Sequence, residues 1–267
     1  MQVLPICVSV TLTVVCSGSH VHSQTGKSYT VCSELNERVV QQFLSGKIEC
    51  IVVDGFETNL SHDSLVKFCK HVDMAGTDQG SEIRSDVITW LPTDSSLSSA
   101  SVANRNLDPV VARDVDSVVK KMNGLHTILS STDCPVDMPS HLQLSHFCSK
   151  DAKYVLHRDN KHKRFLNIDD DFVWFSKPEQ SKRFITCVLY ITPSDWNCHR
   201  GDGGVLRCYM GCEPQDDTRD TAHHTLDVEP NYGRLIIFKS EDLLHEVLPT
   251  RRPGRFALTA WLLRADN

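Results

Sequence analysis

The sequence predicts a mainly β, α+β protein, in which an antiparallel sandwich or barrel of the jelly-roll type carries helices from the N-terminal half. Helical periodicity is confined to residues before about 125, whereas short apolar or alternating runs between Gly, Pro and Asp turns recur from about Leu142 onward. The chain has 267 residues, 40% hydrophobic and 23% charged, which suits one large domain and excludes a disordered or collagen-like protein.

Residues before 142 are expected to be mostly helical. The segments 33–47, 61–72 and 114–125 place apolar side chains at three-to-four-residue spacing, which is typical of helices with one buried face. Ile48–Val53 is a short apolar run and predicts a strand. The Ser-rich segment 93–103 predicts a surface loop.

The C-terminal half reads as a series of short strands separated by turn residues. Their regular spacing is what favours a closed or sandwiched antiparallel sheet over a parallel one. The expected strands are 152–156, 183–192, 204–210, 225–228, 234–238, 245–248 and 255–263.

The N-terminus and the cysteines leave the compartment open. Residues 3–16 have the length of a signal-peptide core and are followed by small residues, but the first Lys or Arg is Lys27. A cleaved signal and a packed N-terminal segment both fit. The 11 cysteines are odd in number and irregularly spaced, so they do not form a small disulfide scaffold. A net charge of -6 argues against a general nucleic-acid binder.

Three residues in the predicted strands form a candidate metal site. His157 and Asp159 are two residues apart, so in an extended strand they point to the same side. His245 lies on a later predicted strand. His-x-Asp alone is a weak signal, but two imidazoles and one carboxylate on one face of a metal are the facial triad of non-haem Fe(II) oxygenases.

Arg255 follows His245 on the next predicted strand and can reach the same barrel interior. A guanidinium binds carboxylate bidentately. Fe(II) with one aspartate and a dianionic 2-oxoglutarate would leave one negative charge in the site, and Arg255 would neutralise it, as a buried site requires.

At these residues the sequence resembles the 2-oxoglutarate- and Fe(II)-dependent prolyl 4-hydroxylases, most closely the hypoxia-inducible-factor type. The resemblance runs from about residue 33 to the C-terminus, with its motifs in the expected order. Arg255 favours this branch, because collagen-type enzymes place Lys there. The matching segments are 84–90, 154–160, 186–190, 203–207, 228–230, 234–238, 245–247 and 255–261.

The resemblance implies a double-stranded β-helix over 142–267, a helical support region over 33–141 and a signal peptide or disordered leader over 1–32. It implies a dioxygenase that uses Fe(2+), 2-oxoglutarate, O2 and L-ascorbate to hydroxylate prolyl residues of a protein or peptide, giving succinate and CO2. Neither a nucleic-acid partner nor stable membrane insertion is expected. The location implied is cytoplasmic or nuclear, or the secretory pathway if residues 1–19 are a cleaved signal.

The resemblance also implies the roles of individual residues. His157, Asp159 and His245 would bind iron, and a loop ion pair would join Asp86 to Arg183. The residues implied to bind 2-oxoglutarate are Arg255, Tyr190, Tyr154 and Thr259.

The chain departs from the family pattern in two places besides its N-terminus. Phe147 stands where the family usually has a tyrosine facing the co-substrate, and residues 160–182 form an insert beside the metal entrance that is either functional or a solvated loop. Arg251 and Arg252 are expected to be solvated, the alternative being that they steer an acidic peptide. Other readings of the chain are the same oxygenase chemistry on another substrate and a non-catalytic jelly-roll binding protein.

A zinc site was the remaining alternative at the cysteines. Cys198, Cys208 and Cys212 match no paired-ligand spacing, which argues against zinc.

Overall fold

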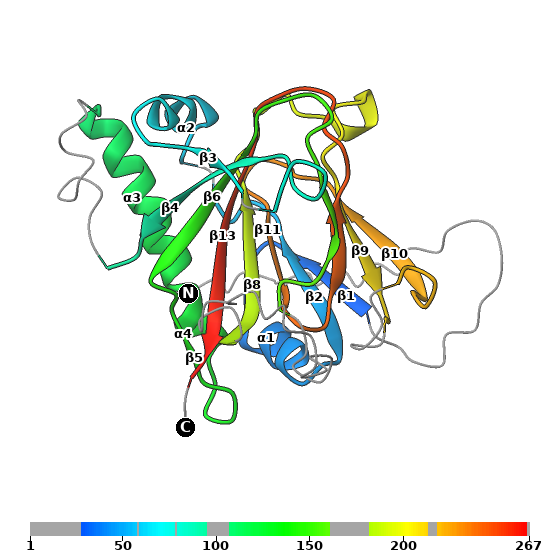
Figure 1. Cartoon of the computed structure of the whole chain (residues 1–267). Coiled ribbons are helices and arrows are strands. Elements are labelled where there is room, and N and C mark those ends of the chain that lie inside the picture. Colours follow the sequence, from blue (N-terminus) through cyan, green and yellow to red (C-terminus); the bar gives the residue numbers. More distant parts are fainter. Residues whose placement is uncertain are drawn as a thin grey trace, which may run out of the picture.

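Two sheets of unequal size face each other in the computed structural model, which describes residues 28–57, 59–77, 79–94, 107–160, 182–212 and 218–265. Figure 1 shows the larger sheet flanked by helices and the smaller sheet standing beside it. The larger sheet of the described residues runs, in order, through β1 (Ser28–Cys32), β2 (Ile48–Val53), β11 (Leu235–Lys239), β8 (Arg183–Tyr190), β13 (Arg255–Arg264), β6 (His141–Phe147), β4 (Val87–Pro92) and β3 (Ala75–Gly76), with β5 (Val136–Asp137) paired to β13. The smaller sheet runs through β10 (His224–Val228), β9 (Leu206–Met210), β12 (Leu244–Val247) and β7 (Tyr154–His157).

Three of the helices in the described residues begin where a polar side chain can satisfy a free backbone N–H. Asn36 accepts from the N–H of Val39, and Ser61 accepts from that of Ser64. The α-helices of the described residues are α1 (Glu37–Leu44), α2 (His62–Cys69), α3 (Pro109–Asn123) and α4 (Leu125–Leu129), and Cys198–Arg200 forms a 3-10 turn.

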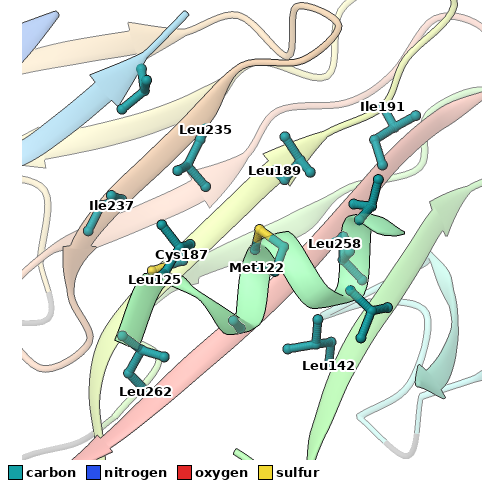
Figure 2. Packing of buried hydrophobic residues seen from close by; sticks show 14 of the residues in the cluster. Met122, Leu125, Leu142, Cys187, Leu189, Ile191, Leu235, Ile237, Leu258 and Leu262 are labelled. Carbon is teal, nitrogen blue, oxygen red and sulfur yellow. The ribbon is translucent and has the colours of Figure 1, made fainter. Parts of the chain in front are cut away.

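One hydrophobic cluster joins helix residues to the outer face of the larger sheet. Figure 2 shows Met122 and Leu125 against side chains of β8 and β13, including Cys187 and Leu258. Met122, Leu125 and Cys187 are fully buried. Burial of such side chains stabilises a fold by roughly 1.5–3 kcal/mol each.

Strand β13 separates this cluster from the space between the sheets, because successive side chains of a strand point to opposite faces. Leu258 and Leu262 belong to the helix-facing cluster. Arg255, Ala257 and Thr259 line the pocket between the sheets. The two-residue period of β13 therefore determines which side chains enter the site.

The predicted helices over 33–47, 61–72 and 114–125 are confirmed with altered bounds, as α1, α2 and α3. The expected strand 48–53 is β2, and the seven expected C-terminal strands are β7 to β13. Strands β4 and β6 were not singled out as strands, although Leu142 and Leu144 alternate with polar residues along β6.

Some expectations fall at the edge of the described residues or beyond it. Ser28–Cys32, expected within the leader, instead forms β1, which pairs in parallel with β2. Residues 1–27, residues 95–103 of the predicted loop and residues 161–181 of the insert lie outside the described residues. None of the described helices is both long enough and apolar enough to cross a membrane.

Candidate metal centre and co-substrate pocket

Two neighbouring strands of the smaller sheet bring the predicted metal ligands together. His157 ends β7 and lies opposite His245 on β12, and Asp159 follows two residues after His157. The Nε2 atom of His157 is 3.6 Å from Oδ1 of Asp159, and Nε2 of His245 is 4.0 Å from Oδ2 of Asp159. One ligand atom from each residue lies within 4.8 Å of the other two. The three groups thus surround one point.

Backbone carbonyls orient both imidazoles. The Nδ1–H of His157 donates to the carbonyl oxygen of Val155 (2.7 Å), and that of His245 donates to the carbonyl oxygen of Leu243 (2.9 Å). Since a carbonyl oxygen only accepts, the proton sits on Nδ1 and the Nε2 lone pair is free for a metal. Two imidazoles and one carboxylate presented in this way are the donor set of a non-haem Fe(II) centre.

Thr186 holds the carboxylate, a role that the sequence did not reveal. Its hydroxyl donates to Oδ2 of Asp159 (2.8 Å) and lies 2.8 Å from the hydroxyl of Ser240. Thr186 is fully buried on β8 of the other sheet. No sequence pattern points to this role, because only the tertiary contact between the sheets brings Thr186 to Asp159.

The protonation states suit metal binding. Burial, with a smaller contribution from His157, lowers the pKa of His245 to about 4, so its imidazole is neutral at pH 7. Burial alone would raise the pKa of Asp159, but His157, His245 and Arg183 outweigh it and hold that pKa well below its usual range. Asp159 is therefore ionised.

A pocket between the sheets contains the triad together with Arg255, Tyr190, Tyr154 and Thr259. Counting its mouth, it holds about 470 Å³ of empty space. The sequence-predicted metal ligands and co-substrate residues thus line one pocket.

Arg255 is a buried cation without an ion-pair partner among the described residues, and it is only 2% exposed. Its Nε donates to the carbonyl oxygen of Gly204 (2.8 Å), and its guanidinium lies over the rings of Phe147 (4.5 Å) and Tyr190 (5.0 Å). The buried hydroxyl of Tyr190 has no hydrogen-bond partner in the described part of the chain. An unpaired buried charge is costly. The donor set therefore fits a carboxylate-bearing ligand such as 2-oxoglutarate.

The other two predicted co-substrate residues occupy the pocket wall. Tyr154 stacks on the imidazole of His157, with ring centroids 3.6 Å apart, and the guanidinium of Arg84 lies 4.7 Å from the Tyr154 ring centroid. Thr259 is buried on β13. Phe147 replaces a hydroxyl contact with an apolar face that packs against Arg255.

The expected ion pair between Asp86 and Arg183 is not among the ion pairs of the described residues. Asp86 is instead held by Arg84, which donates from Nε to Oδ1 (2.6 Å) and from Nη2 to Oδ2 (2.8 Å). Arg183 lies over the ring of Trp261 (3.7 Å) and donates to the carbonyl oxygen of Asp159 (3.5 Å). Arg84 is close in sequence and geometrically suited to both carboxylate oxygens, so it takes the partner expected for Arg183.

Arg251 and Arg252 are both paired within the protein. Arg251 lies 3.2 Å from Asp151, and Arg252 lies 2.9 Å from Asp195 and 3.0 Å from Asp202. This local neutralisation weakens the hypothesis that they steer an acidic peptide.

The fold and the site together resemble those of Fe(II)- and 2-oxoglutarate-dependent oxygenases. Residues 142–263 match the model of the 2OG-Fe(II) oxygenase superfamily, whose members use Fe(2+), 2-oxoglutarate and O2. Among the described residues, the group suited to a metal ion is the triad, and Cys198, Cys208 and Cys212 are not part of it.

The chain also resembles prolyl hydroxylases, which confirms the resemblance in the sequence motifs. It is 23% identical to Egl nine homolog 1 of Homo sapiens over 192 residues, 72% of this chain and 35% of that protein. It is 32% identical to the Rattus norvegicus homologue over 91 residues, 34% of this chain and 23% of that protein. The chain thus spans about a third or less of these relatives.

Solved structures support the jelly-roll fold. A Trichoplax adhaerens prolyl hydroxylase in complex with a hypoxia-inducible-factor peptide aligns with a TM-score of 0.59 and 17% identity, covering 85% of this chain and 87% of that one. A Pseudomonas putida prolyl-4-hydroxylase aligns with a TM-score of 0.56 and 24% identity, covering 86% of this chain and 98% of that one.

Proposed function

We propose that the chain hydroxylates prolyl residues of a protein or peptide substrate, using Fe(II), 2-oxoglutarate and O2. One observation carries the proposal: His157, Asp159 and His245 surround one point in the same pocket as a buried guanidinium, that of Arg255, without an ion-pair partner in the described residues. Such a pocket suits a metal and a dicarboxylate together.

Each side chain has a distinct role in this proposal. The two Nε2 atoms and the carboxylate of Asp159 hold the metal, and Arg255 with the hydroxyl of Tyr190 binds the distal carboxylate of 2-oxoglutarate. Thr259 and Tyr154 form the adjacent walls. When bound, the iron and co-substrate supply oxidative decarboxylation and C–H hydroxylation, releasing succinate and CO2. Ascorbate is proposed to keep the iron reduced.

A prolyl substrate is supported by the walls and by the relatives. Leu206, Val247 and Trp261 line the pocket, so an aliphatic ring would meet apolar surface. The structural neighbours from Trichoplax adhaerens and Pseudomonas putida are both prolyl hydroxylases, the first bound to a hypoxia-inducible-factor peptide. We assign the chemistry to residues 142–267, with 33–141 as its support.

The test is to incubate the protein with Fe(II), 2-oxoglutarate, ascorbate and a panel of proline-containing peptides. Mass spectrometry should show one added oxygen atom on a prolyl residue, with succinate formed in proportion. His245→Ala should abolish both products, whereas His141→Ala, at an exposed histidine on β6, should retain them. Succinate without a modified prolyl residue would favour another substrate. If the protein neither turned over nor bound 2-oxoglutarate, a non-catalytic binding protein would be favoured.

A further inference from the structure

The guanidinium of Arg255 is held by a glycine pair that allows very close packing. Gly203 and Gly204 have φ values of +69° and +71°. A Cβ on Gly203 would lie 2.3 Å from the carbonyl oxygen of Pro249, and one on Gly204 would lie 2.8 Å from Cδ of Arg255. Only glycine tolerates this backbone conformation and this approach. The carbonyl oxygen of Gly204 can thus receive the Nε–H of Arg255.

Backbone contacts tie the glycine pair to the turn before β13. Gly203 forms an isolated bridge with Thr250, and the N–H of Gly204 donates to the carbonyl oxygen of Pro249 (3.2 Å). The indole N–H of Trp196 donates to the carbonyl oxygen of Gly203 (3.2 Å). Gly204 therefore moves only if the loop 196–204 moves with it.

An ion pair fastens this loop from outside the pocket. Nε of Arg252 lies 3.0 Å from Oδ1 of Asp202, and its Nη2 donates to Oδ2 (3.2 Å). Oδ2 of Asp202 also accepts from the backbone N–H of Asn197 (2.7 Å). The Arg252 guanidinium also lies 5.0 Å from the Trp196 ring centroid. Neither Asp202 nor Arg252 is among the pocket-lining residues.

We propose that the Asp202–Arg252 ion pair is a positioning device for the co-substrate site: it holds the Gly203–Gly204 turn and thereby orients the guanidinium of Arg255 toward the distal carboxylate of 2-oxoglutarate. This proposal rests on the proposed function. The pair is partly exposed, with side-chain exposures of 35% for Arg252 and 20% for Asp202, so its direct contribution to folding is small. Its effect is geometric, because small misplacements of a binding group weaken binding strongly.

The variants Asp202→Asn and Arg252→Gln test this role, and Arg251→Gln is the matched control. Arg251 is in the same turn but pairs with Asp151 at an exposed site. Calorimetric titration of 2-oxoglutarate into Mn(II)-loaded protein should give a Kd about 10-fold higher in both test variants. The Kd for Mn(II) should stay within about two-fold of wild type, because the triad is built on other strands. Arg252→Lys should give an intermediate Kd for 2-oxoglutarate, since lysine keeps the positive charge but lacks the planar guanidinium that can bind both carboxylate oxygens. In turnover, KM for 2-oxoglutarate should rise while kcat at saturation is kept.

Three results would overturn the positioning role. The first is a 2-oxoglutarate Kd equal to wild type in both test variants. The second is an equal loss of Mn(II) and 2-oxoglutarate affinity, which would indicate general disruption. The third is the same loss in the Arg251→Gln control. Absence of 2-oxoglutarate binding by the wild type would overturn the proposed function itself, and the wild-type titration shows this before any variant is examined.

Discussion

The two ends of the pocket are held in place by different kinds of structure. At the proposed metal end, His157 and His245 face each other across paired strands, and the Nδ1–H of each ring donates to a carbonyl oxygen two residues earlier. At the proposed co-substrate end, Arg255 is held by Gly204 from a loop and by the rings of Phe147 and Tyr190 from neighbouring strands.

Because the two ends are built differently, the affinity for the metal and the affinity for 2-oxoglutarate should respond to different substitutions. The metal end follows from strand register, local hydrogen bonds and one hydrogen bond from Thr186, so substitutions beyond these residues should change it little. The co-substrate end follows from loop packing, so substitutions outside the pocket can reach it. Metal affinity and 2-oxoglutarate affinity should therefore vary independently, which the following variants test.

The largest effect is expected at the metal end. His157→Ala removes one of the three proposed protein ligands and its stacking with Tyr154, and should weaken Mn(II) binding at least 100-fold, as measured by calorimetry. His199→Ala, at a histidine whose side chain is 87% exposed, is the control and should bind Mn(II) like wild type. Wild-type Mn(II) affinity in His157→Ala would show that the triad does not hold the metal.

The metal end was also the more predictable from sequence. The same-side placement of His157 and Asp159 follows from the two-residue period of a strand, and the apolar run around His245 predicted its strand. The pairing of His157 with His245 required only that the two strands be neighbours.

Contacts between distant segments were the part that sequence could not supply. Thr186 reaches Asp159 from the other sheet, and Gly204 reaches Arg255 from a loop. Asp86 was assigned to Arg183 by resemblance, but the geometry of Arg84 decided the pairing. Such contacts depend on how the sheets and loops stack, which no local periodicity records.

The next largest effect concerns the co-substrate end. Arg255→Gln removes the buried cation and should weaken 2-oxoglutarate binding by about 3 kcal/mol, or about 100-fold. Its Mn(II) affinity should remain close to that of wild type, as calorimetry on the same samples would show. Parallel losses of both affinities would break the separation between the two ends.

Thr186→Val sharpens the comparison at the metal end, because it removes a hydroxyl at nearly constant volume. Loss of its hydrogen bond to Asp159 should weaken Mn(II) binding about 10-fold, since partners that orient metal ligands typically contribute this much. Thr186→Ser keeps the hydroxyl and should restore most of the affinity. If Thr186→Val and Thr186→Ser lost the same Mn(II) affinity, packing rather than the hydrogen bond would be responsible.

The smallest effect lies on the outer face of the co-substrate end, at His146 beside Phe147 on β6. His146 stacks on Phe256, with ring centroids 4.0 Å apart, and burial, aided by the charge of His62, lowers the pKa of His146 to about 4. The unfolded chain, with an ordinary histidine pKa near 6.5, therefore binds the proton first as pH falls.

Stability contributed at His146 is thus present above the unfolded pKa and is lost as pH falls from about 6.5 to about 4. Because His146 is partly exposed, we expect the loss to be about 1–2 kcal/mol. His146→Phe retains the stacking without a titrating group, so its urea-unfolding free energy should fall less across this range than that of wild type. His141→Phe, on the same strand but exposed, should leave the wild-type slope unchanged. If the unfolding free energy of wild type and His146→Phe fell equally with pH, the acid sensitivity would arise from another group. Unchanged 2-oxoglutarate affinity in His146→Phe at pH 7 would show that the outer face of β6 supports the fold without orienting Arg255.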